Sequence, residues 1–82
     1  MSNKVSYVTK EGLKKLQEEL ERLQNVERPK ISKAIGEAIE KGDISENAEY
    51  DAAKDAQGLL EAKIAQLKDT IATCRVIDES QI

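Results

Sequence analysis

The sequence contains no histidine, no tryptophan and no phenylalanine, and its only cysteine is Cys74. Without histidine, the chain has no imidazole for acid–base catalysis or for metal binding. A single cysteine permits no internal disulfide, and without histidine it cannot build a structural zinc site. We therefore expect a chain from a reducing compartment that performs no imidazole-dependent or zinc-dependent chemistry.

Long apolar runs are absent as well. No window approaches the roughly 18 apolar residues of a transmembrane helix, and no apolar signal-peptide core follows the first residues. We expect a cytoplasmic protein that makes no membrane contact. Two aromatics are few for a compact core, whereas abundant Ala, Glu, Lys, Leu and Gln favour long helices within one small domain of 82 residues.

The net charge of −3 is distributed unevenly. Residues 1–33 carry eight basic and five acidic side chains, residues 34–51 carry one basic and six acidic, and residues 52–82 carry four basic and five acidic. The middle of the chain is therefore strongly acidic. Such a segment repels nucleic-acid phosphates unless a cation lies between them.

The first half of the chain predicts a helix over about residues 9–41. Thr9 is a suitable N-cap, and Gly42 is a natural stop. Between them, apolar residues form one stripe: Leu13, Leu16, Leu20, Leu23, Ile31, Ile35 and Ala38. Pro29 interrupts this stripe, so we expect a kink or a short break near residues 25–29.

A second helix is predicted over about residues 46–75. Its apolar stripe is Ala48, Ala52, Ala56, Leu60, Ile64, Leu67, Ile71 and Cys74. Folding the chain about residue 43 brings the two stripes together, with Leu23 by Ile64, Ile35 by Ala52 and Ala38 by Ala48. The sequence therefore predicts an all-α fold, an antiparallel two-helix coiled-coil hairpin with an acidic tip at residues 42–46.

The tip admits two explanations. In the structural one, Asp43 caps the second helix and Glu46 completes a capping box three residues later. In the functional one, the same two carboxylates converge on a hard cation such as Mg²⁺. Two exposed carboxylates form only half a site, so a partner would have to supply the remaining ligands, as in two-metal phosphoryl chemistry.

The segment Gly42-Asp43-Ile44-Ser45-Glu46-Asn47-Ala48-Glu49-Tyr50 closely resembles the tip of the bacterial Gre transcript cleavage factors. Other matching stretches cover nearly the whole chain: Leu13 through Leu20, Arg28-Pro29 before Ile31, Ala52-Ala53-Lys54, Gln57-Gly58 and Val76-Ile77-Asp78. The resemblance implies that residues 1–76 are the N-terminal coiled-coil hairpin domain of such a factor. Residues 77–82 would then begin the linker to a C-terminal FKBP-like domain that this chain lacks.

The resemblance also implies a function. Gre hairpins enter the secondary channel of bacterial RNA polymerase and stimulate its magnesium-dependent cleavage of backtracked RNA, so that elongation restarts. By position, Asp43 and Glu46 would be the catalytic acids, and they would share Mg²⁺ with the polymerase active centre. The chain alone would bind no cofactor. The protein would be a catalytic accessory of the polymerase and not itself an enzyme.

Four further residues are candidates for contact with the partner: Ser45, Asn47, Tyr50 and Lys54. Ser45 and Asn47 also suit a capping role at the turn. Lys54 matches a basic position that in Gre factors faces the 3′ segment of the backtracked RNA. Ile39 stands where some Gre factors carry arginine, so the basic patch is thin, as in the GreA-like branch. For the basic run Arg28, Lys30 and Lys33, a solvated face is expected in preference to a nucleic-acid site.

Two other functions remain alternatives. One is a channel-binding Gre homologue that inhibits polymerase, which would require a hairpin that misplaces its acids. The other is a purely structural helical arm of a larger protein. The presence of both Asp43 and Glu46 in the tip segment argues against each of them.

Overall fold

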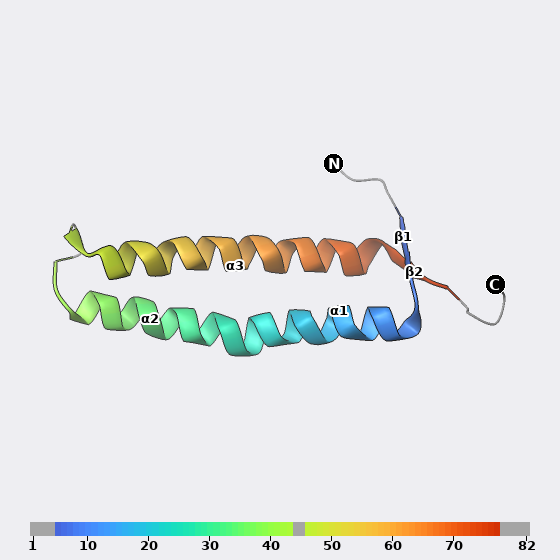
Figure 1. Cartoon of the computed structure of the whole chain (residues 1–82), viewed down its shortest axis with the longest axis horizontal. Coiled ribbons are helices and arrows are strands. Elements are labelled where there is room, and N and C mark those ends of the chain that lie inside the picture. The colour runs from blue at the N-terminus through green and yellow to red at the C-terminus, as the bar shows by residue number, and fades with distance from the viewer. Residues whose placement is uncertain (1–4, 44–45, 78–82) are drawn as a thin grey trace.

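The computed structural model describes residues 5–43 and 46–77, which form a helical hairpin measuring 60 × 26 × 13 Å (Figure 1). Its elements follow the chain as β1 (Ser6–Val8), α1 (Lys10–Arg22), the π-helical turn η1 (Leu23–Glu27), α2 (Arg28–Glu40), α3 (Ala48–Thr73) and β2 (Cys74–Val76). The segment α1-η1-α2 runs antiparallel to α3, which confirms the predicted all-α hairpin. None of the described helices is long and apolar enough to cross a membrane.

The first helix begins as its sequence predicts. Thr9 has an extended backbone, and its hydroxyl accepts a hydrogen bond from the amide of Gly12 at 3.0 Å. Glu11 lies in the first turn, where the positive end of the helix dipole favours a carboxylate. This N-cap fixes the start of α1 at Lys10, next to β1.

The expected break near residues 25–29 is a π-helical turn in a continuous helix. In η1 the amide of Arg28 bonds to the carbonyl of Leu23, five residues earlier. Leu23 and Ile31 are eight residues apart, one more than a heptad, and both face α3. A π-helical turn contains more residues than an α-helical turn, so it takes up the extra one. Pro29 lies in the first turn of α2, directly after this widened turn.

The core lies at the middle of the hairpin. Leu23 (2% exposed) packs with Leu60 (7%) and Ile64 (2%), and three half-buried residues extend this cluster: Leu20, Ile31 and Leu67. Leu23 meets Ile64 as the matched stripes predict. A few leucine and isoleucine side chains therefore hold the long helices together.

Near the tip, the predicted stripe of the second helix is wrong. Ala48 and Ala52 are exposed, whereas Tyr50 and Ala53 are half-buried, and Ala38 is buried at 1%. Successive steps of four residues drift by about 40° each around a helix of 3.6 residues per turn. The predicted stripe goes from Leu60 to Ala56, Ala52 and Ala48 in such steps. Ala52 and Ala48 therefore lie on a face of α3 that has rotated away from the first helix.

Two short strands close the other end of the hairpin, and the sequence patterns did not predict them. β1 and β2 pair in parallel, with Tyr7 opposite Arg75, and the amide of Ile77 bonds to the carbonyl of Val8 at 2.8 Å. Each strand has three residues, which is too short to show an alternating apolar pattern. The pair holds the start of the first helix against the end of α3.

Candidate functional site at the hairpin tip

The tip begins where α2 ends. The amides of Lys41 and Gly42 each bond back three residues, to the carbonyls of Ala38 and Ile39, at 3.3 Å. Gly42 then adopts a φ of +135°, a conformation that residues with a Cβ rarely take. This glycine ends the helix as predicted and turns the chain toward α3.

Asp43 and Glu46 are joined by one backbone hydrogen bond, from the amide of Glu46 to the carbonyl of Asp43 at 3.3 Å. The predicted capping box is wrong, because α3 begins at Ala48 and its N-cap is Asn47. Helix two therefore starts two residues later than expected, which leaves Asp43 and Glu46 outside the helix. Ser45, the other candidate cap, lies outside the described residues.

Asn47 uses its side chain on both sides of the turn. Its Oδ1 accepts hydrogen bonds from the amides of Glu49 and Tyr50, both at 3.1 Å. Its Nδ2 donates a hydrogen bond to the carbonyl of Ala38, in the last turn of α2. The capping role expected for Asn47 is confirmed, and the bond to Ala38 adds a direct link between the two helices.

One polar hollow lies at the tip, lined by Lys41, Asp43, Glu46, Asn47 and Glu49. The structure thus brings the two predicted acids to the same surface. Across the hollow, Lys41 Nζ and Glu49 Oε2 are 2.7 Å apart, and both side chains are 62% exposed. The hydrogen bond to Glu49, aided by the charge of that carboxylate, raises the pKa of Lys41.

The donor atoms at the tip suit a hard cation, but they are too few to enclose one. Asp43 and Glu46 offer carboxylate oxygens, the ligands that Mg²⁺ prefers. Within residues 5–43 and 46–77, no cluster of three or more acidic, cysteine or histidine side chains is arranged to hold a metal ion. The residues at the tip therefore fit a half-site, to which other oxygen ligands must be added.

Tyr50 and Lys54, the remaining candidates, do not line the hollow. Tyr50 is half-buried in the first turn of α3, and its amide takes part in the cap. Lys54 is exposed, and its Nζ donates to Gln57 Oε1 at 3.0 Å. Ile39 is 46% exposed on α2. Lys41 and Glu49 were not among the predicted site residues, although opposite charges on either side of a predicted turn could have indicated their pairing.

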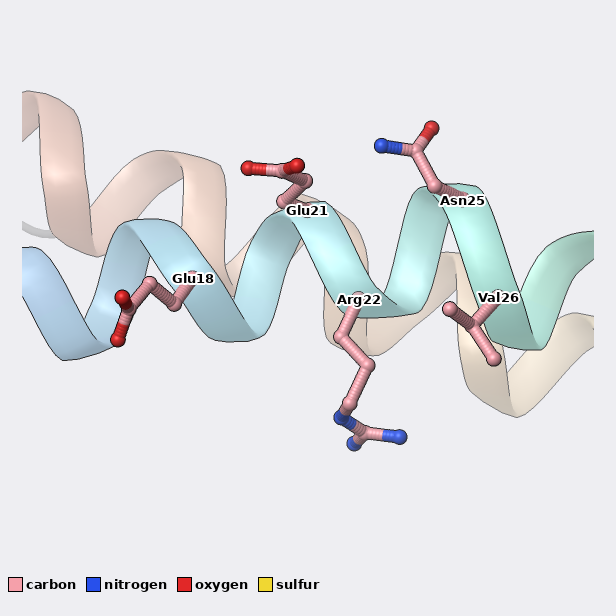
Figure 2. A pocket seen from close by; sticks show the side chains of 5 residues that line it. All are labelled: Glu18, Glu21, Arg22, Asn25 and Val26. Carbon is pink, nitrogen blue, oxygen red and sulfur yellow. The ribbon is translucent and has the colours of Figure 1, made fainter.

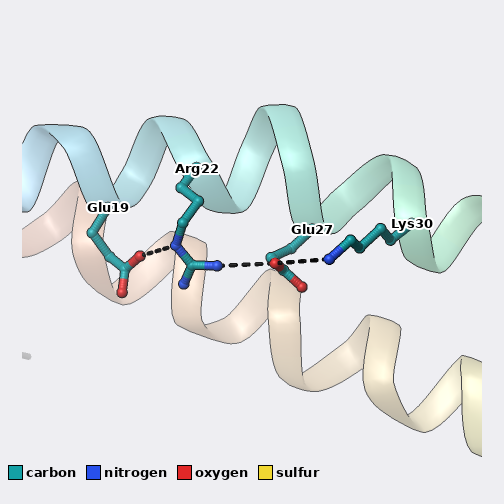
Figure 3. Close-up of polar contacts among 4 residues, drawn as sticks. All are labelled: Glu19, Arg22, Glu27 and Lys30. Carbon is teal, nitrogen blue, oxygen red and sulfur yellow. Dashed lines mark hydrogen bonds and ion pairs between the residues drawn. The ribbon is translucent and has the colours of Figure 1, made fainter.

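Near the π-helical turn, Arg28 and Lys30 of the basic run are paired with carboxylates, as is the neighbouring Arg22. Arg22 bonds to Glu19 at 2.7 Å and to Glu27 at 2.9 Å, and Lys30 lies 3.8 Å from Glu27 (Figure 3). Arg28 bonds across the hairpin to Glu61. Neighbouring carboxylates thus offset the positive charges of Arg28 and Lys30, which favours the expected solvated face over a nucleic-acid site.

A hollow next to Arg22 lies on the surface of α1 and η1. Its lining consists of Glu18, Glu21, Arg22, Asn25 and Val26 (Figure 2). The lining carries two carboxylates and one guanidinium, so its charged side chains are mostly acidic. It therefore offers no surface suited to a nucleic-acid backbone.

Residues 6–76 match the family model GreA_GreB_N, described as "Transcription elongation factor, N-terminal". The chain belongs to this family. The match includes both helices, both strands and the tip, so the hairpin is the N-terminal domain of a Gre factor.

Curated relatives named "Transcription elongation factor GreA" agree with this membership. The chain is 68% identical over 80 residues to the protein of Christiangramia forsetii and 62% identical over 80 residues to that of Flavobacterium johnsoniae. Both alignments cover 98% of this chain and 51% of the relative. The Mycoplasma pneumoniae relative is 53% identical over 76 residues, with 93% of this chain and 48% of the relative covered. The chain therefore spans about half the length of the curated relatives it matches.

Proposed function

We propose that this chain is the hairpin half of a GreA-like transcription elongation factor that acts on bacterial RNA polymerase. The hairpin enters the secondary channel and stimulates the cleavage of backtracked RNA by the polymerase, which releases arrested complexes. It is a catalytic accessory in the cytoplasm, where the polymerase supplies the active centre. The other half of the relatives' length would provide an FKBP-like domain that docks at the channel mouth.

One observation carries the proposal: Asp43 and Glu46 line a single hollow at the end of a narrow hairpin. A hairpin 60 Å long and 13 Å thick in its shortest dimension suits delivery of charge along a channel. The acids lie outside α3, so neither is required to cap the helix. A purely structural arm does not need two carboxylates turned to one surface at its end.

Asp43 and Glu46 would hold Mg²⁺ together with ligands from the polymerase. The ion would supply positive charge that activates the attacking water and stabilises the leaving oxygen. The residues of this chain would contribute two negatively charged oxygen donors and their orientation. Lys54, exposed on α3, would attract the phosphates of the RNA 3′ segment, and Tyr50 would contact the partner beside the tip.

The test uses stalled, backtracked elongation complexes with the chain alone and the chain fused to a docking domain. We expect the fused form to shorten the RNA at much lower concentration, because its second contact raises the effective concentration of the hairpin. Asp43→Asn and Glu46→Gln should each reduce the stimulated cleavage rate by about 100-fold or more, since each removes a charge that acts in the transition state.

Circular dichroism of both variants serves as the control for folding. The proposed function is wrong if Asp43→Asn and Glu46→Gln retain helicity and still cleave at the rate of the unsubstituted chain. Inhibition of the polymerase by the unsubstituted chain, without RNA shortening, would instead identify the inhibitory homologue.

A further inference from the structure

We propose that Asn47 is a positioning residue, which holds the two tip acids in place by tying the start of α3 to the end of α2. This inference rests on the proposed function of Asp43 and Glu46. Two hydrogen bonds accepted by Asn47 Oδ1 cap α3 and explain where this helix begins. The cap does not need the third hydrogen bond of Asn47, which its Nδ2 donates. The bond from Nδ2 to the carbonyl of Ala38 crosses from one helix to the other.

The two ends of this link are fixed. Ala38 is 1% exposed, so its position is set by the packing of α2 on α3. Asn47 is half-buried and bonds two amides of the first turn of α3. Asp43 and Glu46 belong to the segment between Ala38 and Asn47. The bond therefore joins the two ends of the short segment that carries both acids.

The ion pair of Lys41 and Glu49 spans the same loop, but it is a weaker constraint. Both of its side chains are 62% exposed and long, and such pairs contribute little because water and salt screen them. The amide side chain of Asn47 is shorter, and three hydrogen bonds fix its orientation. We therefore assign the positioning role to Asn47 and not to Lys41.

Two substitutions separate the cap from the link. Asn47→Asp keeps an oxygen that caps α3, but it replaces the donor facing the Ala38 carbonyl with an acceptor. Asn47→Ser also keeps a capping oxygen and is too short to reach that carbonyl. Because only the aspartate adds a charge near the acids, an effect shared by both variants reports the loss of the link.

The first readout concerns the chain without polymerase. Backbone order parameters of Gly42 and Glu46, measured by ¹⁵N relaxation, should fall from rigid values near 0.85 toward 0.6 in both variants. Helicity should stay unchanged because the cap remains. As a matched control, Thr9→Ala removes the N-cap of α1 at the opposite end. This control should lower the melting temperature and leave the order of the tip unchanged.

The second readout is cleavage by the fused form on backtracked complexes. We expect Asn47→Asp and Asn47→Ser to lower the maximal cleavage rate by about 10- to 100-fold, since small misplacements of reacting groups carry costs of this size. The concentration that gives half-maximal stimulation should not change. A residue that merely contacts the polymerase would produce the opposite pattern.

The inference is overturned if both variants retain an ordered tip, or if they act only by raising the half-maximal concentration. A failure of the proposed function is recognised separately. In that case Asp43→Asn would leave cleavage unchanged, while the order parameters would still report whether Asn47 fixes the tip.

Discussion

The guanidinium of Arg28 donates two hydrogen bonds to the carboxylate of Glu61, at 2.9 and 2.7 Å, across 33 residues of sequence. Arg28 is the first residue after the π-helical turn, and Glu61 lies on α3 next to the buried Leu60. The pair thus joins the two helices at the point where the first returns to α-helical geometry. The planar guanidinium suits this two-point contact, which a lysine would not reproduce.

Removal of this pair should make the hairpin slightly less stable in a salt-dependent manner. We expect Arg28→Met and Glu61→Gln each to lower the melting temperature a little in low salt, because both side chains are nearly half exposed. In about 1 M NaCl, where the screening length is only about 3 Å, the difference should disappear. Thermal unfolding followed by circular dichroism measures both effects. Lys33→Met, at another exposed position on α2, serves as the control without this bridge.

The same pair predicts a pH dependence. The hydrogen bond from Arg28 lowers the pKa of Glu61 below its ordinary value of 4.5. The ionised Glu61 carboxylate therefore stabilises the folded chain fully above pH 4.5, the ordinary pKa that it has in the unfolded chain. This stabilisation is lost as the pH falls through the lowered pKa of Glu61 in the folded chain. Urea unfolding of the unsubstituted chain and of Glu61→Gln should differ near neutral pH and converge in acid. A difference that grew as the pH fell would contradict this assignment.

Two adjacent leucines provide a direct test of the core. Leu60 is 7% exposed within the central cluster, whereas Leu59 is 74% exposed. Leu60→Ala should reduce the free energy of unfolding by about 2–5 kcal/mol, since it removes apolar contacts and leaves a cavity. Leu59→Ala makes the same chemical change at the surface and should stay within about 0.5 kcal/mol. Similar losses in the two variants, measured by urea denaturation, would show that α3 faces α2 differently.

Much of this fold follows from periodicity. The spacing of Leu13, Leu16, Leu20 and Leu23 predicted the seam, and Gly42 predicted the end of the first helix. The phase of α3 near the tip was mispredicted because alanines occur on more than one of its faces. Ala48, Ala52, Ala53 and Ala56 do not by themselves indicate which face is buried.

The sequence predicted the acidic residues of the candidate site, but it did not predict the N-cap and the hydrogen bond between the helices that surround them. Asp43 and Asn47 are about equally good N-cap residues, so the sequence did not decide where α3 begins. The structure decides it in favour of Asn47, because this residue also reaches the carbonyl of Ala38 on the other helix. Such a link depends on the distance between two helices, which one sequence does not contain.

The tip should bind magnesium poorly in the absence of polymerase. Asp43 and Glu46 provide two carboxylates at an exposed surface, and the nearby Lys41 places a positive charge in the same hollow. We expect a dissociation constant on the order of 1 mM or weaker, since Mg²⁺ holds its water shell and needs further ligands. Titration of the chain with MgCl₂, followed by amide chemical shifts of the tip, measures it. Micromolar binding that disappears in the Asp43→Asn variant would show a more complete site than the half-site described.

The π-helical turn predicts that deletion of one residue within η1 preserves the apolar seam, whereas deletion of one residue within α1 disrupts it. Asn25 is exposed within η1, and its removal leaves seven residues from Leu23 to Ile31, which is a regular heptad. The deleted chain should therefore keep its seam as a continuous α-helix. Pro29 would then lie in the interior of that helix, where it costs about 3 kcal/mol.

Adding Pro29→Ala to the Asn25 deletion should therefore restore most of the lost stability. Deletion of Gln17, an exposed residue in the regular part of α1, is the matched control. It rotates the residues before it by about 100° relative to the seam and turns Leu13 and Leu16 away from α3. Because that loss is one of packing, Pro29→Ala should not repair it. Urea denaturation of the four chains measures this difference, and equal rescue of both deletions would contradict the role assigned to the π-helical turn.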